Sequence, residues 1–117
     1  MDNYKDDAYY SDKIRSDIMF IVEHTKGIEK TDLRNNEILL DSMMFRLIQI
    51  SENAKKMSEE YKVSHDAIPW NNISGLRNKI VHDYGNVNVD IIYSTVKDDI
   101  PELLIYLEND NDTRDEK

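Results

Sequence analysis

The sequence predicts an all-α protein, a four- to five-helix antiparallel bundle. Two observations support this fold class. Apolar residues recur at steps of three and four along most of the chain, and no window shows the alternation of a half-buried strand. The chain also contains only three glycines. Its 117 residues are enough for one domain with a modest core, but not for two.

The first two helices follow from this spacing. Apolar positions from Tyr10 to Val22 predict a helix from about Tyr9 to Lys26, which Gly27 then stops. The polar stretch IEKTDLRNNE that follows is expected to connect the two helices and to contain at most a short helical start. A longer helix carries apolar residues from Ile38 to Met57 and runs to about Glu60. The two helices are expected to form an antiparallel hairpin.

A third helix begins near Pro69, because proline is tolerated in the first turn of a helix and disrupts its interior. It is expected to run to Tyr84. Gly85 and Asn86 come next, and these residue types adopt the left-handed conformation after a helix end at the lowest cost.

The last helix is predicted to start after Asn88, which can cap it, and its apolar positions continue to Leu107. Pro101 lies inside this pattern and should kink or divide the helix. The helical domain therefore spans residues 9–108. Residues 1–8 and the acidic tail 109–117 are expected to be flexible and solvated.

Composition excludes several classes of protein. The net charge of −9 argues against broad electrostatic binding to nucleic acid, so any contact with RNA must be local. The chain has no cysteine, and no apolar run is long enough to span a membrane. The first residues do not resemble a signal peptide. These features predict a cytoplasmic protein without a membrane segment.

The stretch GLRNKIVHDYGN, residues 75–86, concentrates residue types that do chemistry. His82 can exchange a proton near neutral pH, and Arg77 can hold a phosphate through its planar guanidinium. Together they suit RNA cleavage in which a base takes the proton of the ribose 2′-hydroxyl and a cation stabilises the charge on the phosphoryl oxygens. This chemistry requires neither a metal nor a cofactor. His24 and His65 lack a second ligand at helical spacing, so no metal is assigned to them.

Helix geometry limits how this pair can act. On a regular helix Arg77 and His82 point roughly 140° apart and do not converge on one small ligand. Either the helix end is distorted near Asp83, or a second copy brings its own pair across a twofold axis. We favour the second solution, a homodimer whose seam holds four such side chains.

Each of these residues also has an ordinary structural explanation. Arg77 can pair with an acidic neighbour, and His82 is a residue type favoured at helix C-termini. Asn78 can contact RNA phosphate, orient His82, or simply lie on the surface. Tyr84 can pack its ring against the last helix, and Trp70 fits a core or dimer anchor better than a platform for base stacking.

The segment IPWNNISGLRNKIVHDYGNVNVDIIYSTVKDDIPEL, residues 68–103, resembles the C-terminal half of the HepT-like toxins, which belong to the HEPN superfamily. The stretches DIMFIVEHTKG and QISENAKKM extend this resemblance over most of the chain. Its most specific element is an arginine, four residues, a histidine, one residue and a tyrosine, matched here by Arg77, His82 and Tyr84.

The resemblance implies a homodimeric ribonuclease toxin of a type VII-like toxin–antitoxin system, with Arg77 and His82 as catalytic residues near the dimer interface. It implies a minimal nucleotidyltransferase antitoxin as partner, which silences the toxin by AMPylation of Tyr84. Glu52 occupies a polar position familiar from the relatives and is a candidate to orient Arg77 or His82.

Two further residues are site candidates, and three residues depart from the family pattern. Asn78 and Lys79 are candidates to support RNA binding, Lys79 by adding local positive charge. The chain departs from the relatives in the loop after the motif, where it has Gly85 and Asn86 instead of an aromatic residue and glycine, and Asn88 instead of the usual capping aspartate. These departures affect the expected substrate preference more than the motif itself.

Two functions stay open on the sequence. The first is a ribonuclease toxin that cuts RNA without a metal. The second is a non-catalytic helical module that binds a nucleotide or interacts with a nucleotidyltransferase. The net acidity of the chain slightly favours the second, and the intact motif of Arg77, His82 and Tyr84 favours the first more strongly.

Overall fold

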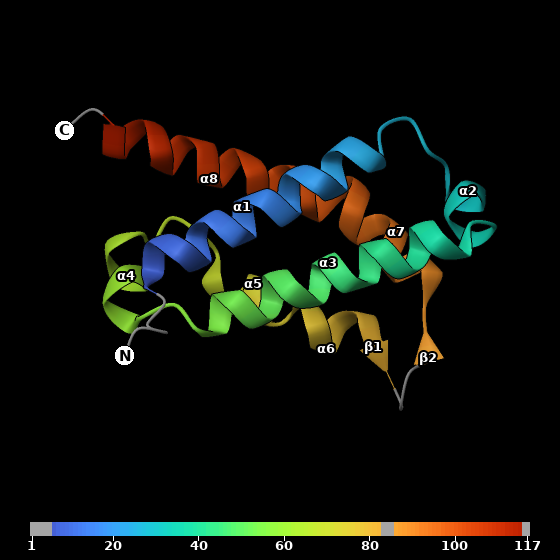
Figure 1. Cartoon of the computed structure of the whole chain (residues 1–117), viewed down its shortest axis with the longest axis horizontal. Helices are drawn as coiled ribbons and strands as arrows, with labels where there is room; N and C mark the ends of the chain where they lie inside the picture. The colour runs from blue at the N-terminus through green and yellow to red at the C-terminus, as the bar shows by residue number, and fades with distance from the viewer. Residues whose placement is uncertain (1–5, 83–85, 116–117) are drawn as a thin grey trace.

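Four helical rods lie side by side in the computed structural model, which describes residues 6–82 and 86–115, without the side chains of His82, Asn86 and 111–115. The first rod is α1 (Asp7–His24), the second is α3 (Glu37–Lys55), and the third consists of α5 (Trp70–Ser74) and α6 (Leu76–Ile80). The fourth combines α7 (Val89–Ser94), the π-helical segment η1 (Thr95–Asp99) and α8 (Ile100–Asp115). Consecutive rods run in opposite directions (Figure 1), so the predicted antiparallel all-α bundle is confirmed.

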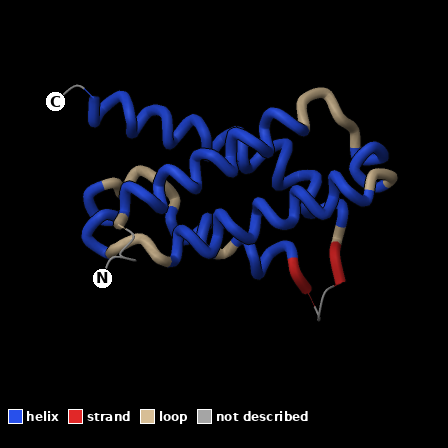
Figure 2. Tube along the Cα trace, viewed as in Figure 1, coloured by secondary structure: helices blue, strands red, loops and turns tan. Residues whose placement is uncertain are grey.

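Short elements connect these rods. Helix α2 (Lys30–Arg34) lies between α1 and α3, as the sequence predicted for that connection, and α4 (Glu59–Ser64) lies between α3 and α5. Strands β1 (Val81–His82) and β2 (Asn86–Val87) form a two-residue antiparallel ladder at the edge of the otherwise helical molecule (Figure 2).

Side-chain caps explain where several helices begin. Asp6 accepts a hydrogen bond from the Tyr9 amide at the start of α1, and Asn36 accepts one from the Leu39 amide at the start of α3. Asn88 caps α7 in the same way, as predicted, by accepting from the Ile91 amide.

The core lies where the four rods meet. Fully buried aliphatic side chains from all of them contribute to it: Ile14, Ile18, Ile21, Met43, Leu47, Ile50, Ile73, Ile80, Ile92, Val96 and Ile100. Their spacing of three and four residues is the pattern that predicted the helices. Trp70 is buried with them, and its indole Nε1 donates to the His65 carbonyl at 3.0 Å, which supports the core role predicted for this residue.

One ion pair is buried between α1 and α3. Arg46 Nη1 donates to Asp17 Oδ1 at 2.7 Å, and the carboxylate of Asp17 is almost fully shielded from solvent. The guanidinium of Arg46 also stacks over the ring of Phe20, 3.8 Å from its centroid. This pair fixes how α1 and α3 lie against each other.

The second helix ends earlier than predicted. It stops at Lys55 instead of about Glu60, and α4 starts after Ser58. Ser58 terminates the earlier helix because its hydroxyl accepts from the Tyr61 amide and donates to Asp7 Oδ2 at 2.6 Å. A cap that binds α1 at the same time outweighs the tendency of the sequence to continue as one helix.

The third helix is not continuous. Gly75 is both the C-cap of α5 and the N-cap of α6. Its backbone has φ −87° and ψ −1°, and the chain turns there. The predicted end at Tyr84 is also wrong, because α6 ends at Ile80 and Val81 is extended at φ −111° and ψ 110°. Val81 instead pairs with Val87, and β-branched residues favour this extended pairing over another helical turn.

Pro101 divides the last rod, as predicted. The five residues before Ile100 form the π-helical turn η1, in which the Ile100 amide donates to the carbonyl of Thr95. Helix α8 then continues to Asp115, into the segment that the sequence assigned to a solvated tail. None of the helices in the described ranges has the length and apolar character needed to cross a membrane.

Candidate active site

Helix α6 carries the candidate arginine, and two buried side chains hold it in place. Leu76 and Ile80, four residues apart, face the core against α3. The hydroxyl of the buried Ser51 on α3 donates to the Ser74 carbonyl at 2.6 Å, just before α6 begins. Although α6 has only five residues, its position is therefore set by packing on one side and a buried hydrogen bond at its start.

Arg77 lies at the edge of α6 that faces α3, and half of its side chain is exposed. Its Nε is 4.0 Å from Glu52 Oε2, and the same oxygen lies 3.7 Å from Lys55 Nζ. Glu52 therefore lies beside Arg77, and its role in orienting the guanidinium stays a prediction. The guanidinium is left accessible for an anionic ligand, because its contact with the carboxylate is long and covers one side only.

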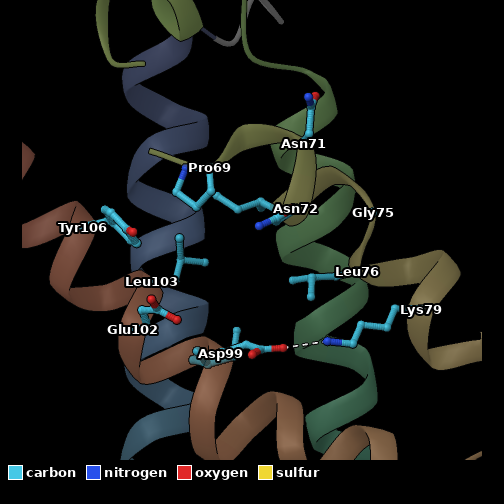
Figure 3. A pocket seen from close by; sticks show the side chains of 12 residues that line it. Pro69, Asn71, Asn72, Gly75, Leu76, Lys79, Asp99, Glu102, Leu103 and Tyr106 are labelled. Carbon is cyan, nitrogen blue, oxygen red and sulfur yellow. Dashed lines mark hydrogen bonds and ion pairs between the residues drawn. The ribbon is translucent and has the colours of Figure 1, made fainter. Parts of the chain in front are cut away.

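Lys79 lies on the other side of α6. Two residues along a helix amount to a rotation of roughly 200°, so Lys79 and Arg77 point in nearly opposite directions. Lys79 Nζ pairs with Asp99 Oδ2 of η1 at 2.7 Å (Figure 3). Its charge is therefore neutralised in this structure, while Asn78, between the two, is exposed to solvent.

A pocket of about 500 Å³ opens beside this ion pair, between α5, α6, η1 and α8. The ion pair closes one side of it, and Pro69, Asn72 and Leu103 lie around the remainder (Figure 3). Glu102 also lines the pocket, so its charged lining is acidic overall and disfavours a phosphate. The sequence assigned no function to this pocket, and of its lining residues only Lys79 was singled out for RNA binding.

The structure describes the backbone of His82 and not its side chain. It belongs to β1, where it pairs with Asn86, and it is not on a regular helix. The 140° separation expected from helix geometry therefore does not apply, because the helical path ends at Ile80. The first of the two solutions suggested from the sequence was a distortion near Asp83, whereas the helix ends three residues earlier, at Ile80. Tyr84, the predicted site of AMPylation, lies outside the described residues.

The other two histidines, His24 and His65, each stack on an aromatic ring. His65 stacks on the ring of Tyr61, with centroids 3.9 Å apart, and its Nε2 is 3.7 Å from Asp110 Oδ2. His24 stacks on Phe20. Among the side chains that the structure describes, no three or more of His, Asp and Glu form a group that could hold a metal ion.

With this geometry in place, similarity to known proteins defines the class of the protein. A family model described as "Ribonuclease HepT-like" matches residues 14–109, a range that contains the Arg77–His82 segment and at least part of each of the four rods. The chain therefore belongs to the HepT-like ribonuclease family. No solved structure gives a significant match.

Two relatives are similar over most of their length. The chain is 34% identical to "Putative RNase TTE0752" of Caldanaerobacter subterraneus subsp. tengcongensis, with 80% of this chain and 84% of the relative covered. It is 32% identical to "Probable ribonuclease HepT" of Thermococcus cleftensis, with 80% of this chain and 86% of the relative covered.

Proposed function

We propose that the protein is a ribonuclease toxin that cuts RNA without a metal, using Arg77 and His82 of two subunits at a shared cleft. The observation that supports this most is the position of Arg77. It is a half-exposed arginine on a helix packed against α3, with its Nε 4.0 Å from Glu52 Oε2, and it lies five residues before a histidine that follows the end of that helix.

The reaction requires only groups that the chain supplies. His82 takes the proton from the ribose 2′-hydroxyl, and the 2′-oxygen attacks the adjacent phosphorus. Arg77 stabilises the negative charge that builds up on the phosphoryl oxygens. The bond from phosphorus to the 5′-oxygen breaks, and that oxygen takes up a proton. The products are one RNA end with a 2′,3′-cyclic phosphate and one with a 5′-hydroxyl.

We propose a homodimer as the active form and a minimal nucleotidyltransferase antitoxin as its partner. Transfer of AMP to Tyr84 would add bulk and negative charge two residues from His82, where the RNA phosphate must bind. This inhibition is electrostatic and steric, so it does not require the protein to unfold. Mass spectrometry of the protein made with and without the antitoxin tests it, since one adenylate on Tyr84 is expected only in the first sample.

The competing function is a module that binds a nucleotide or a nucleotidyltransferase without cutting RNA. The net charge of −9 and the neutralised Lys79 favour it, because both weaken attraction to RNA. Incubation of the purified protein with total tRNA and mRNA in chelator separates the two functions. We expect cleavage by the wild type and a loss of about 10²- to 10⁴-fold in His82→Ala. If neither protein cuts any RNA, the ribonuclease proposal is wrong.

A further inference from the structure

The pocket beside the Lys79–Asp99 ion pair has the size and the lining of a site for a small ligand. Its volume of about 500 Å³ lies within the range of about 300–1,000 Å³ that is usual for such sites. The buried side chains of Ile100 and Leu103 form its apolar inner part, while amide, phenol and carboxylate groups line its exposed part. A ligand that fits the pocket therefore has an apolar body and polar edges.

Two walls of the pocket carry polar side chains. Glu102 and Tyr106 are four residues apart on α8, so they lie on the same side of that helix, with Leu103 beside them (Figure 3). Asn72 of α5 lies on the opposite wall (Figure 3). Within the described part of the chain, the side chains of Asn72, Glu102 and Tyr106 have no hydrogen-bond or ion-pair partner. These three groups are therefore available to a ligand.

The charge of the pocket favours a ligand that donates hydrogen bonds. Lys79 is already bound by Asp99 at 2.7 Å, so Glu102 is the charged lining group without a partner among the described residues. A carboxylate only accepts hydrogen bonds, and two parallel N–H groups bind it best. Among the nucleobases, guanine has such an edge, because its N1–H and 2-amino group are adjacent. Adenine, cytosine and uracil each place an acceptor beside the donor, which the carboxylate repels.

The pocket and Arg77 lie on two sides of the same short helix. Lys79 at the edge of the pocket and Arg77 point in nearly opposite directions from α6, and a helix with its side chains is about 10–12 Å across. The exposed Asn78 lies between them. A few nucleotides of single-stranded RNA can span this width. A strand whose phosphate binds Arg77 can therefore place a neighbouring base in the pocket, while its phosphates stay outside the acidic lining.

We propose that the pocket binds a guanine base of single-stranded RNA, a few nucleotides from the phosphate that is cut. Glu102 accepts from N1–H and the 2-amino group, the ring of Tyr106 stacks on the base, and Asn72 donates to N7 on the opposite edge. The proposal rests on the ribonuclease function given above, and it adds a base preference to that function.

Binding of short RNA strands tests the base preference. The probes are fluorescent 2′-O-methyl oligouridylates with one guanosine, and matched strands with inosine, adenosine or cytidine at the same position. The 2′-O-methyl groups prevent attack by the 2′-oxygen, so binding is measured without cleavage. We expect the guanosine strand to bind about tenfold more tightly than the inosine strand, which lacks only the 2-amino group. Equal affinity for these two strands would overturn the proposal.

Variants of α8 test which side chains read the base. Glu102→Gln should abolish the preference for guanosine, because the amide replaces one acceptor by a donor. Glu108→Gln is the matched control, since Glu108 is another exposed glutamate of α8 and does not line the pocket. Tyr106→Ala should weaken binding of the guanosine strand about tenfold, whereas Tyr106→Phe should bind it like the wild type. A guanosine preference that persists in Glu102→Gln would contradict the proposal.

A free guanine nucleotide offers the same base, and competition separates the two sources. GMP should displace the guanosine strand only at concentrations well above the dissociation constant of the strand, because it lacks the neighbouring phosphates that bind outside the pocket. If GMP binds as tightly as the strand, a nucleotide is the ligand and the assignment to RNA is wrong.

Cleavage of natural RNA is measured separately, so the two proposals can fail independently. If the guanosine strand binds through Glu102 but the wild type cuts no RNA, the base site is supported and the ribonuclease function is not. If RNA is cut at no fixed distance from guanosine, and Glu102→Gln cuts it equally well, the function is supported and the base site is wrong.

Discussion

The carboxylate of Glu52 on α3 faces the guanidinium of Arg77 on α6, with Oε2 4.0 Å from Nε. Both side chains are close to half exposed, so this ion pair contributes less than about 1 kcal/mol to stability. We propose that it acts on the direction in which the guanidinium points, so the consequences are expected in activity rather than in folding.

Glu52→Gln is therefore expected to lower the cleavage rate about three- to tenfold, because the neutral amide holds Arg77 less firmly. The free energy of unfolding should stay within about 0.5 kcal/mol of the wild type. Single-turnover cleavage and urea denaturation measure the two quantities. Glu23→Gln is the control, since Glu23 is an exposed glutamate near the end of α1 and is paired with Lys26, and it should change neither.

Arg77→Ala should lower cleavage by about 10²- to 10³-fold, as expected for the loss of a group that stabilises charge in the transition state. Arg34 provides a matched control, because it is 51% exposed, compared with 50% for Arg77, and is likewise paired with a carboxylate. Arg34→Ala should cut RNA at the wild-type rate. Similar losses in both variants would mean that general positive charge, and not the position of Arg77, is responsible.

The ends of the cleaved RNA report on the reaction. Attack by the 2′-oxygen leaves a 2′,3′-cyclic phosphate, so the upstream fragments should resist labelling at the 3′ end until the cyclic phosphate is opened and removed. The downstream fragments should accept a 5′-phosphate from a kinase directly. Fragments with a 5′-phosphate would instead indicate attack by water and exclude the role given to His82.

Lys79→Ala is expected to leave RNA binding almost unchanged, because Asp99 already neutralises the lysine at 2.7 Å. A lysine that contacts phosphate lowers the slope of log affinity against log salt by about one when it is removed. We expect this change for Arg77→Ala and not for Lys79→Ala. A lower salt slope for Lys79→Ala would contradict this expectation. It would show that RNA displaces Asp99 and that Lys79 contacts phosphate.

Arg46→Ala should destabilise the fold by about 3 kcal/mol, because it leaves the carboxylate of Asp17 buried without its partner. For a domain of this size the melting temperature should fall by roughly 10 °C. The second carboxylate oxygen of Asp17 has no hydrogen-bond partner among the described residues, so no contact at that oxygen compensates for the loss of Arg46. Combining Arg46→Ala with Asp17→Asn should recover part of the loss, since the amide carries no charge.

The four rods could be predicted because their apolar spacing is set by burial on one side. The ends of α3 at Lys55 and of α6 at Ile80 could not be predicted from the sequence, because they depend on contacts between distant segments. Ser58 ends the second helix by binding Asp7 of α1, and Val81 leaves the third helix to pair with Val87. Gly85 and Asn86 suggested a later stop from local preferences alone.

The candidate site shows the same division. The motif around Arg77 could be recognised from residue types and spacing. Its acidic neighbours could not be found from spacing, because Glu52 and Asp99 reach the two sides of α6 from different helices. Glu52 was named only through the resemblance to the family, and Asp99 was not named at all. In a chain with 24 acidic residues, sequence spacing cannot select these two partners.

The π-helical turn at Thr95–Asp99 has a consequence for comparing this chain with its relatives. A π turn holds one residue more than an α turn at nearly the same length, so it behaves as a single-residue insertion inside a helix. Relatives one residue shorter here should align with a gap between Ser94 and Pro101, and in them the position that pairs with Lys79 would be rotated away from α6.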